Sequence, residues 1–221
     1  MAKKILLAWL LFMISSGLIF ADSPDDENNF PKNTISFDGG LLVQNLFLMG
    51  MLNIVDYDSK AAAFGAAVQY ERQMTRNFSL LGRLEYKYLG ISTLDMSVFS
   101  IGGYARFYPT GRVFFLDGNL GYSVFHMENK DAVMPLSHYF RYGLRLGWRI
   151  DFGRPGGFIM EPSLGYNGVI GYTRAWFDPD ESSGNSFRDS LNFLAYGMYD
   201  IFVRQFFVGG LAFNICFGYR F

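Results

Sequence analysis

The sequence holds few side chains suited to catalysis or to binding a metal ion. Its two histidines, His126 and His138, stand at the two ends of one predicted loop, where they could hold a metal across a hairpin. In the two-residue alternation, both histidines occupy positions on the apolar face of their strands. This placement favours residues at an apolar rim over ligands of a metal ion. A hydrolase would need a base, an orienting acid and a nucleophile together, and two histidines placed in this way do not supply them.

Two further candidates are an acidic segment and a cysteine. Residues 178–184 read Asp-Pro-Asp-Glu-Ser-Ser-Gly and resemble the start of a calcium loop, but Gly184 stands at position seven rather than six. Asp189 stands where the loop needs a bidentate Glu, so an acidic surface loop is the better interpretation. Cys216 excludes an internal disulfide because it is the single cysteine, and we expect it to be a small buried residue. The sequence therefore predicts no catalytic residue, no metal and no cofactor.

The larger set of reactive side chains is ionic and recurs at alternate positions along the chain. It contains six acids and seven bases: Asp38, Glu71, Glu85, Asp117, Asp151 and Glu161, with Arg83, Lys87, Arg106, Arg141, Arg145, Arg149 and Arg220. If these side chains share an interior, their balance indicates mutual neutralisation, because a buried charge without a partner is costly. One sign of charge usually dominates a selective pore. We therefore expect them to close the interior, with a pore lining as the alternative.

The elements that carry these charges are predicted strands. Apolar and polar or small residues alternate with a period of two, which is typical of a strand with two different faces. The segments are about as long as the roughly 9–11 residues that a tilted strand needs to cross lipid. Eight such segments span residues 35–43, 64–73, 78–88, 99–107, 114–124, 140–151, 158–167 and 211–221.

Residue types indicate which face points inward. The apolar face is crowded with Phe, Tyr and Trp, in a chain with 24 Phe and 14 Tyr, and such rings are too bulky for the interior of a small barrel. The other face mixes Gly with Arg, Glu and Asp, whereas the outside of a soluble, lipocalin-like barrel would favour Lys, Thr and Glu. The sequence thus predicts an eight-stranded antiparallel transmembrane β-barrel with its rings toward lipid and its charges inside.

The first residues have the order of a secretory signal peptide. Lys3 and Lys4 precede an apolar stretch over residues 5–20, and Ala21 precedes an acidic segment. An uncleaved anchor is the alternative, although 16 residues fall short of the roughly 20 that a spanning helix needs. We predict a signal peptide over residues 1–21, an acidic periplasmic segment over 22–33 and a barrel over 34–221. Without the two lysines the chain keeps 17 bases against 20 acids, which suggests no nucleic-acid partner.

Link lengths predict the orientation of the barrel. Short turns alternate with longer links, and outer-membrane barrels keep their short turns on the periplasmic side. Both termini are then expected in the periplasm. The short turns are residues 75–77, 109–112 and 152–157, and the outer links are 50–60, 90–93, 127–137 and 173 onward.

One segment does not fit the alternation. Residues 191–203 carry apolar side chains on both strand faces, and these recur at the three- and four-residue steps of a helix. A capping box over 186–189 precedes the segment, and Gly209 and Gly210 follow it as a stop. We expect an amphipathic helix in the last extracellular link, on the barrel rim or the outer leaflet, with an irregular ninth strand as the alternative.

The last eleven residues resemble the closing strand of bacterial outer-membrane β-barrels. Aromatic or apolar residues occupy every second place from Leu211 to Tyr219 and Phe221. With the signal peptide and the strand rhythm, the chain resembles the small outer-membrane barrel superfamily of OmpA-, OmpX- and OmpW-like proteins. The resemblance implies an outer-membrane location in contact with lipid, and insertion by the barrel-assembly machinery through a signal that includes Tyr219 and Phe221.

The resemblance leaves two functional hypotheses open. The first is a non-enzymatic surface barrel with a charge-plugged interior, whose loops contact host or envelope components. The second is a narrow, OmpW-like channel for small hydrophobic solutes. No motif in the sequence separates these subgroups, so no ligand-binding residue is assigned.

Overall fold

The structure is a computed structural model that describes residues 32–40, 61–91, 94–109, 113–129, 132–133, 135–153, 156–171, 194 and 196–221. Within these ranges the chain is mostly strand, with a helical segment before the last strand. The strands are β1 (Asn33–Asp38), β2 (Ala61–Thr75), β3 (Phe78–Ile91), β4 (Leu94–Phe107), β5 (Phe114–Asn129), β6 (Ala132–Val133), β7 (Ser137–Trp148), β8 (Ile150–Phe152), β9 (Phe158–Gly171) and β10 (Gly210–Arg220).

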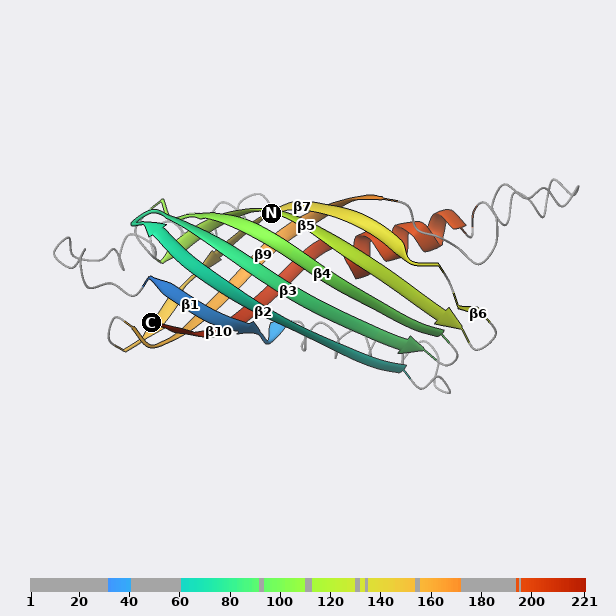
Figure 1. The fold of residues 1–221 in the computed structure, drawn as a ribbon, viewed down its shortest axis with the longest axis horizontal. Coiled ribbons are helices and arrows are strands. Elements are labelled where there is room, and N and C mark those ends of the chain that lie inside the picture. The colour runs from blue at the N-terminus through green and yellow to red at the C-terminus, as the bar shows by residue number, and fades with distance from the viewer. Residues whose placement is uncertain are drawn as a thin grey trace, which may run out of the picture.

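The strands close into a single antiparallel barrel (Figure 1). Hydrogen-bonded neighbours follow the order β10-β1-β2-β3-β4-β5-β7-β9, and β9 also pairs with β10, which completes the ring. β7 and β8 are two parts of one wall strand, since both pair with β9, and β6 pairs with β5 beyond the wall. The described wall therefore has eight strands, and the predicted fold class is confirmed.

The two ends of the barrel differ. Asn33 and Phe221 exchange backbone hydrogen bonds of 3.0 and 2.9 Å, and the short β2–β3 turn at residues 76–77 lies at the same end, where Tyr108 N–H donates to Asn77 O at 2.9 Å. We call this the terminus end. The opposite end, called the helix end, receives the helical segment that leads into β10 (Figure 1).

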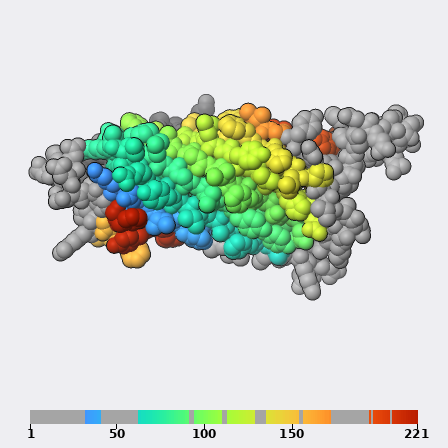
Figure 2. Space-filling view, viewed as in Figure 1, coloured from blue at the N-terminus to red at the C-terminus, as the bar shows by residue number. Residues whose placement is uncertain are grey.

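Burial alternates along the wall strands. In β10 the side chains of Asn214 and Cys216 are buried in the lumen, whereas Phe213 and Phe217 are exposed on the outside. The outer face carries exposed aromatic and aliphatic residues on every long strand, and Figure 2 shows β1 to β7 and β10 as one continuous body. An apolar exterior around a polar lumen is the arrangement of a transmembrane barrel and the reverse of a soluble one. The described wall therefore has the two faces of a transmembrane β-barrel.

Glycine makes room for the charged lumen at close approaches of the wall. A Cβ at Gly165 of β9 would lie 2.7 Å from Leu144 O and 2.9 Å from the Cβ of Arg145. The missing side chain therefore lets β7 and β9 pair closely while Arg145 turns inward. This use of glycine in strand interiors agrees with the expected crowding of the polar face.

The helix before β10 is confirmed, but its expected position on the rim or outer leaflet is wrong in part. Leu194 and residues 196–202 are α-helical, and η1 (Val203–Val208) continues them as a π-helical turn. Met198 is exposed on one side, whereas Val203 and Phe207 are buried inside the helix end of the barrel. The apolar side chains on the inner side of this segment bury more apolar surface in the lumen than they would on the rim.

Several predictions lie outside the described residues. They concern the signal peptide (1–21), most of the acidic segment (22–31), the link over 50–60, the capping box at 186–189 and the acidic loop at 178–184. Among the described residues, no helix combines the length and the hydropathy that a membrane-spanning helix requires.

Candidate functional site in the barrel lumen

The centre of the ionic lumen is Arg106 of β4, whose guanidinium is fully buried. Its Nε and Nη2 donate to the two carboxylate oxygens of Asp117 at 2.8 and 3.1 Å. Its Nη1 donates to Glu161 at 2.9 Å and to Glu71 at 3.1 Å. The same group lies 3.7 Å from the ring centroid of Phe115. One arginine therefore joins β4 to β5, β9 and β2 across the lumen.

Arg149 joins the same carboxylates from the other wall. It lies between β7 and β8, where its backbone N–H donates to Val113 O at 2.6 Å. Its side chain donates to Glu161 at 2.6 Å and also to Glu71. Tyr108 supplies a further hydrogen bond to Glu71, at 2.7 Å. Each carboxylate thus has several donors, which is the condition under which a buried charge is tolerated.

Arg145 completes this group from β7. Its Nε and Nη2 donate to one oxygen of Asp117 at 2.8 and 2.5 Å. The resulting cluster contains three carboxylates and three guanidinium groups, so its formal charge is zero. We call it the balanced layer, and it consists of Glu71, Asp117 and Glu161 with Arg106, Arg145 and Arg149.

A second cluster lies farther toward the helix end. Arg83 of β3 forms an ion pair with Asp38 at 2.6 Å and with Glu85 at 3.1 Å. Lys87 and Arg141 approach the other oxygen of Glu85 at 3.0 and 3.5 Å. We call these five residues the cationic layer, because three bases share two acids.

The remaining predicted charges form a pair at the terminus end. Arg220 lies 3.5 Å from Asp151, whose side chain is 41% exposed, and donates to Gln73 at 3.3 Å. The structure thus gives each predicted ionic residue an ionic neighbour and buries all of them in the lumen except Asp151, which is exposed, and Lys87, which is partly buried. Tyr219 and Phe221 are exposed at the outer edge of the same end, where the Tyr219 ring lies 5.5 Å from that of Phe158.

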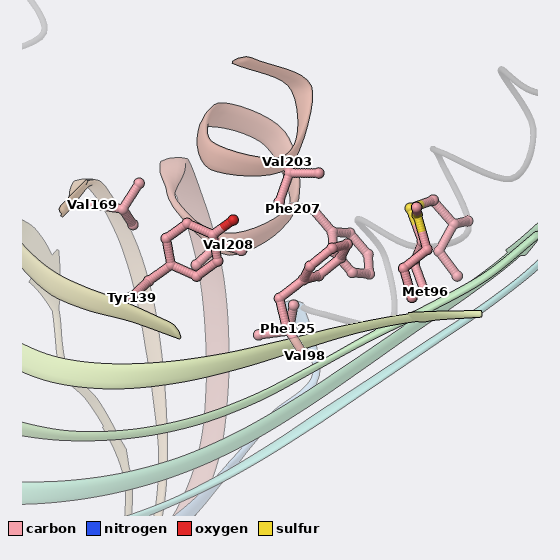
Figure 3. Packing of buried hydrophobic residues seen from close by; sticks show 10 residues of the cluster. Met96, Val98, Phe125, Tyr139, Val169, Val203, Phe207 and Val208 are labelled. Carbon is pink, nitrogen blue, oxygen red and sulfur yellow. The ribbon is translucent and has the colours of Figure 1, made fainter. Parts of the chain in front are cut away.

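The helix end of the lumen is apolar, which the sequence reasoning missed. Val203, Phe207 and Val208 of η1 point toward Phe125 and Tyr139 of the wall, and the Phe125 and Phe207 rings meet edge to face at 6.0 Å (Figure 3). We call the buried group the apolar cluster. The available signal was an inverted alternation near the strand ends, where the inward positions are apolar (Met96, Val98, Phe125, Met127) and the positions between them are polar (Asp95, Ser97, His126, Glu128). The cluster comprises Leu89, Met96, Val98, Phe125, Met127, Tyr139, Val169, Val203, Phe207 and Val208.

The two histidines lie away from the lumen. The Nδ1 of His138 is 2.7 Å from Tyr122 Oη on the outer face, and the two rings stack at 5.9 Å. His126 Nε2 lies 4.0 Å from Glu128. Within the described ranges, no three His, Cys, Asp or Glu side chains gather as a metal site would require. Cys216 is buried in the lumen wall, as expected for a small inward residue.

Two solved structures of one outer-membrane protein are similar to this chain. No family model matches the chain, and no curated protein matches it. The backbone structure of the Yersinia pestis outer membrane protein Ail in a phospholipid bilayer nanodisc has 13% identity and a TM-score of 0.43, and the match covers 86% of this chain and 99% of Ail. The crystal structure of Ail, the attachment invasion locus protein of Yersinia pestis, has 11% identity and a TM-score of 0.44, with 87% and 99% covered.

Proposed function

We propose that the protein is a non-enzymatic outer-membrane barrel whose lumen is closed and whose extracellular loops carry a structural or binding role. The observation that carries the proposal is the sequence of barriers along the axis. A neutral network of ion pairs, the cationic layer and the apolar cluster follow one another from the terminus end to the helix end. Transport through such a lumen would have to disturb each of them.

The barriers differ in kind, which strengthens the proposal. Breaking a buried ion pair by removing one partner costs about 3–5 kcal/mol, so the balanced layer resists opening. The apolar cluster excludes water from the helix end because its side chains pack against one another. Two cavities in the middle of the lumen have volumes of only about 30 and 10 Å³. We place the terminus end in the periplasm, because short turns mark the periplasmic side of such barrels.

The contacts of the barrel follow from this placement. The outer face would contact outer-membrane lipid. The barrel-assembly machinery would recognise Tyr219 and Phe221 during insertion. The links at the helix end would be available to host or envelope components. These roles need no catalytic residue.

The closed lumen is tested by single-channel conductance of the refolded protein in a planar bilayer. We expect no steady current at moderate voltage, because ions would have to cross the apolar cluster. A steady current would favour a conducting barrel instead. Uptake of a small hydrophobic dye into vesicles tests the narrow-channel alternative separately, since an uncharged solute carries no current.

A further inference from the structure

The middle of the lumen contains a cavity whose lining is mainly cationic. Its volume is about 30 Å³, enough for two or three water-sized occupants at roughly 10–15 Å³ each. Its charged lining consists of one acid, Glu85, and four bases: Arg83, Lys87, Arg141 and Arg145. The cavity lies between the cationic layer and the balanced layer.

The described carboxylates do not neutralise this lining. Asp117 already accepts two hydrogen bonds from Arg106 besides those from Arg145, and it belongs to a layer with no net charge. In the cationic layer, Asp38 is paired with Arg83, and Glu85 must serve three bases. Three positive charges against two negative charges leave an excess of one.

The hydrogen bonds show the same deficit of acceptors. Arg83 is 5% exposed, and its buried Nη1 has no hydrogen-bond partner among the described residues. A buried donor without an acceptor and an uncompensated buried charge are both costly. One occupant with a negative charge would remove both.

We propose that this cavity binds one small inorganic anion of the size of chloride or bromide. The anion would accept from Arg83 Nη1 and lie beside Arg141 and Lys87. Asn214 also lines the cavity, and its Oδ1 accepts from Arg83 Nη2 at 3.3 Å. The anion would act as a structural counter-ion for the cationic layer, independently of what the loops bind.

The test compares stability in chloride with stability in gluconate at equal ionic strength, because gluconate is too large for the cavity. The protein is refolded into vesicles in each salt, and its urea-unfolding equilibrium is followed by tryptophan fluorescence. Stabilisation by a bound ligand grows with its concentration over the dissociation constant, so the unfolding constant should fall about tenfold when chloride is roughly ten times that constant. Equal stability in the two salts would overturn the proposal.

Two variants assign the effect to the cavity. Asn214→Asp adds a carboxylate of almost the same shape beside Arg83, so this variant should be more stable than the wild type in gluconate and should no longer respond to chloride. Arg141→Gln removes the excess charge and should also abolish the response. Arg72→Gln is the matched control, because Arg72 is exposed and its described partner is Asn33. An unchanged response in Asn214→Asp would show that chloride acts elsewhere.

A measurement on the wild type covers the case in which a variant does not fold. Crystals grown in bromide should show an anomalous peak between Arg83 and Arg141. A peak-free cavity at full bromide concentration would show that water alone fills it. Single-channel conductance tests the closed lumen separately from the anion site. A steady current would contradict the closed lumen but would leave the bromide peak unchanged.

Discussion

Arg106 on β4 donates two parallel hydrogen bonds to Asp117 on β5, at 2.8 and 3.1 Å, and the two residues are directly opposite each other in the strand register. A two-pronged pair of this geometry fixes both side chains. Asp117 also accepts two hydrogen bonds from Arg145, so two of the three arginines of the balanced layer contact this carboxylate.

Neutralising that carboxylate should destabilise the barrel strongly. Asp117→Asn leaves Arg106 and Arg145 buried with one negative charge fewer, and we expect a loss of about 3–5 kcal/mol in the free energy of unfolding. Urea unfolding in vesicles measures it. Asp95→Asn is the matched control, because Asp95 pairs with the exposed hydroxyl of Tyr88 and should lose about 1 kcal/mol or less. Equal losses in the two variants would contradict the role of burial.

Shortening the helix side chain in the lumen tests the apolar cluster. Phe207→Ala removes a ring that is 3% exposed and packs on Phe125, and we expect a loss of about 3–5 kcal/mol from the cavity that remains. The unfolding free energy is again the measurement. Phe99→Ala removes a ring from the lipid-facing side, where acyl chains can occupy the space, so its loss should be clearly smaller. If Phe99→Ala proved the costlier change, the helix end would not be packed as described.

The direction of the two faces is tested by labelling cysteines from the lipid phase, in a Cys216→Ser background. Leu144→Cys should react with a maleimide dissolved in the bilayer, because Leu144 is 74% exposed on the outer face. Ser123→Cys should stay unlabelled, since Ser123 is buried in the lumen. Mass spectrometry of the folded protein reports both. The opposite pattern would mean that the barrel is inside out.

The orientation of the barrel is tested by trypsin on intact cells. We expect cleavage after Arg174, in the long link over residues 173–187, and none after Arg112, in the short turn over 109–112. Fragment masses identify the cut. Opening the outer membrane serves as the control for access to Arg112. A cut after Arg112 in intact cells would place the terminus end outside.

The sequence predicted the strands and their faces because both are local properties. A period of two is imposed by the extended backbone, so Arg141, Arg145 and Arg149 could be assigned to one side of a strand without knowledge of the partner strand. The helix before β10 was predictable for the same reason, from the three- and four-residue steps of its apolar residues.

The sequence by itself thus determined an eight-stranded barrel with charges inside and rings outside. Only the tertiary structure decided that Arg106 meets Glu161, 55 positions along the chain, and that Glu85 is shared by three bases. It also decided that Phe207 packs inside the lumen instead of on the rim. These contacts depend on the register with which the ring closes, which sets the height of each side chain along the barrel axis, and no local pattern fixes that register.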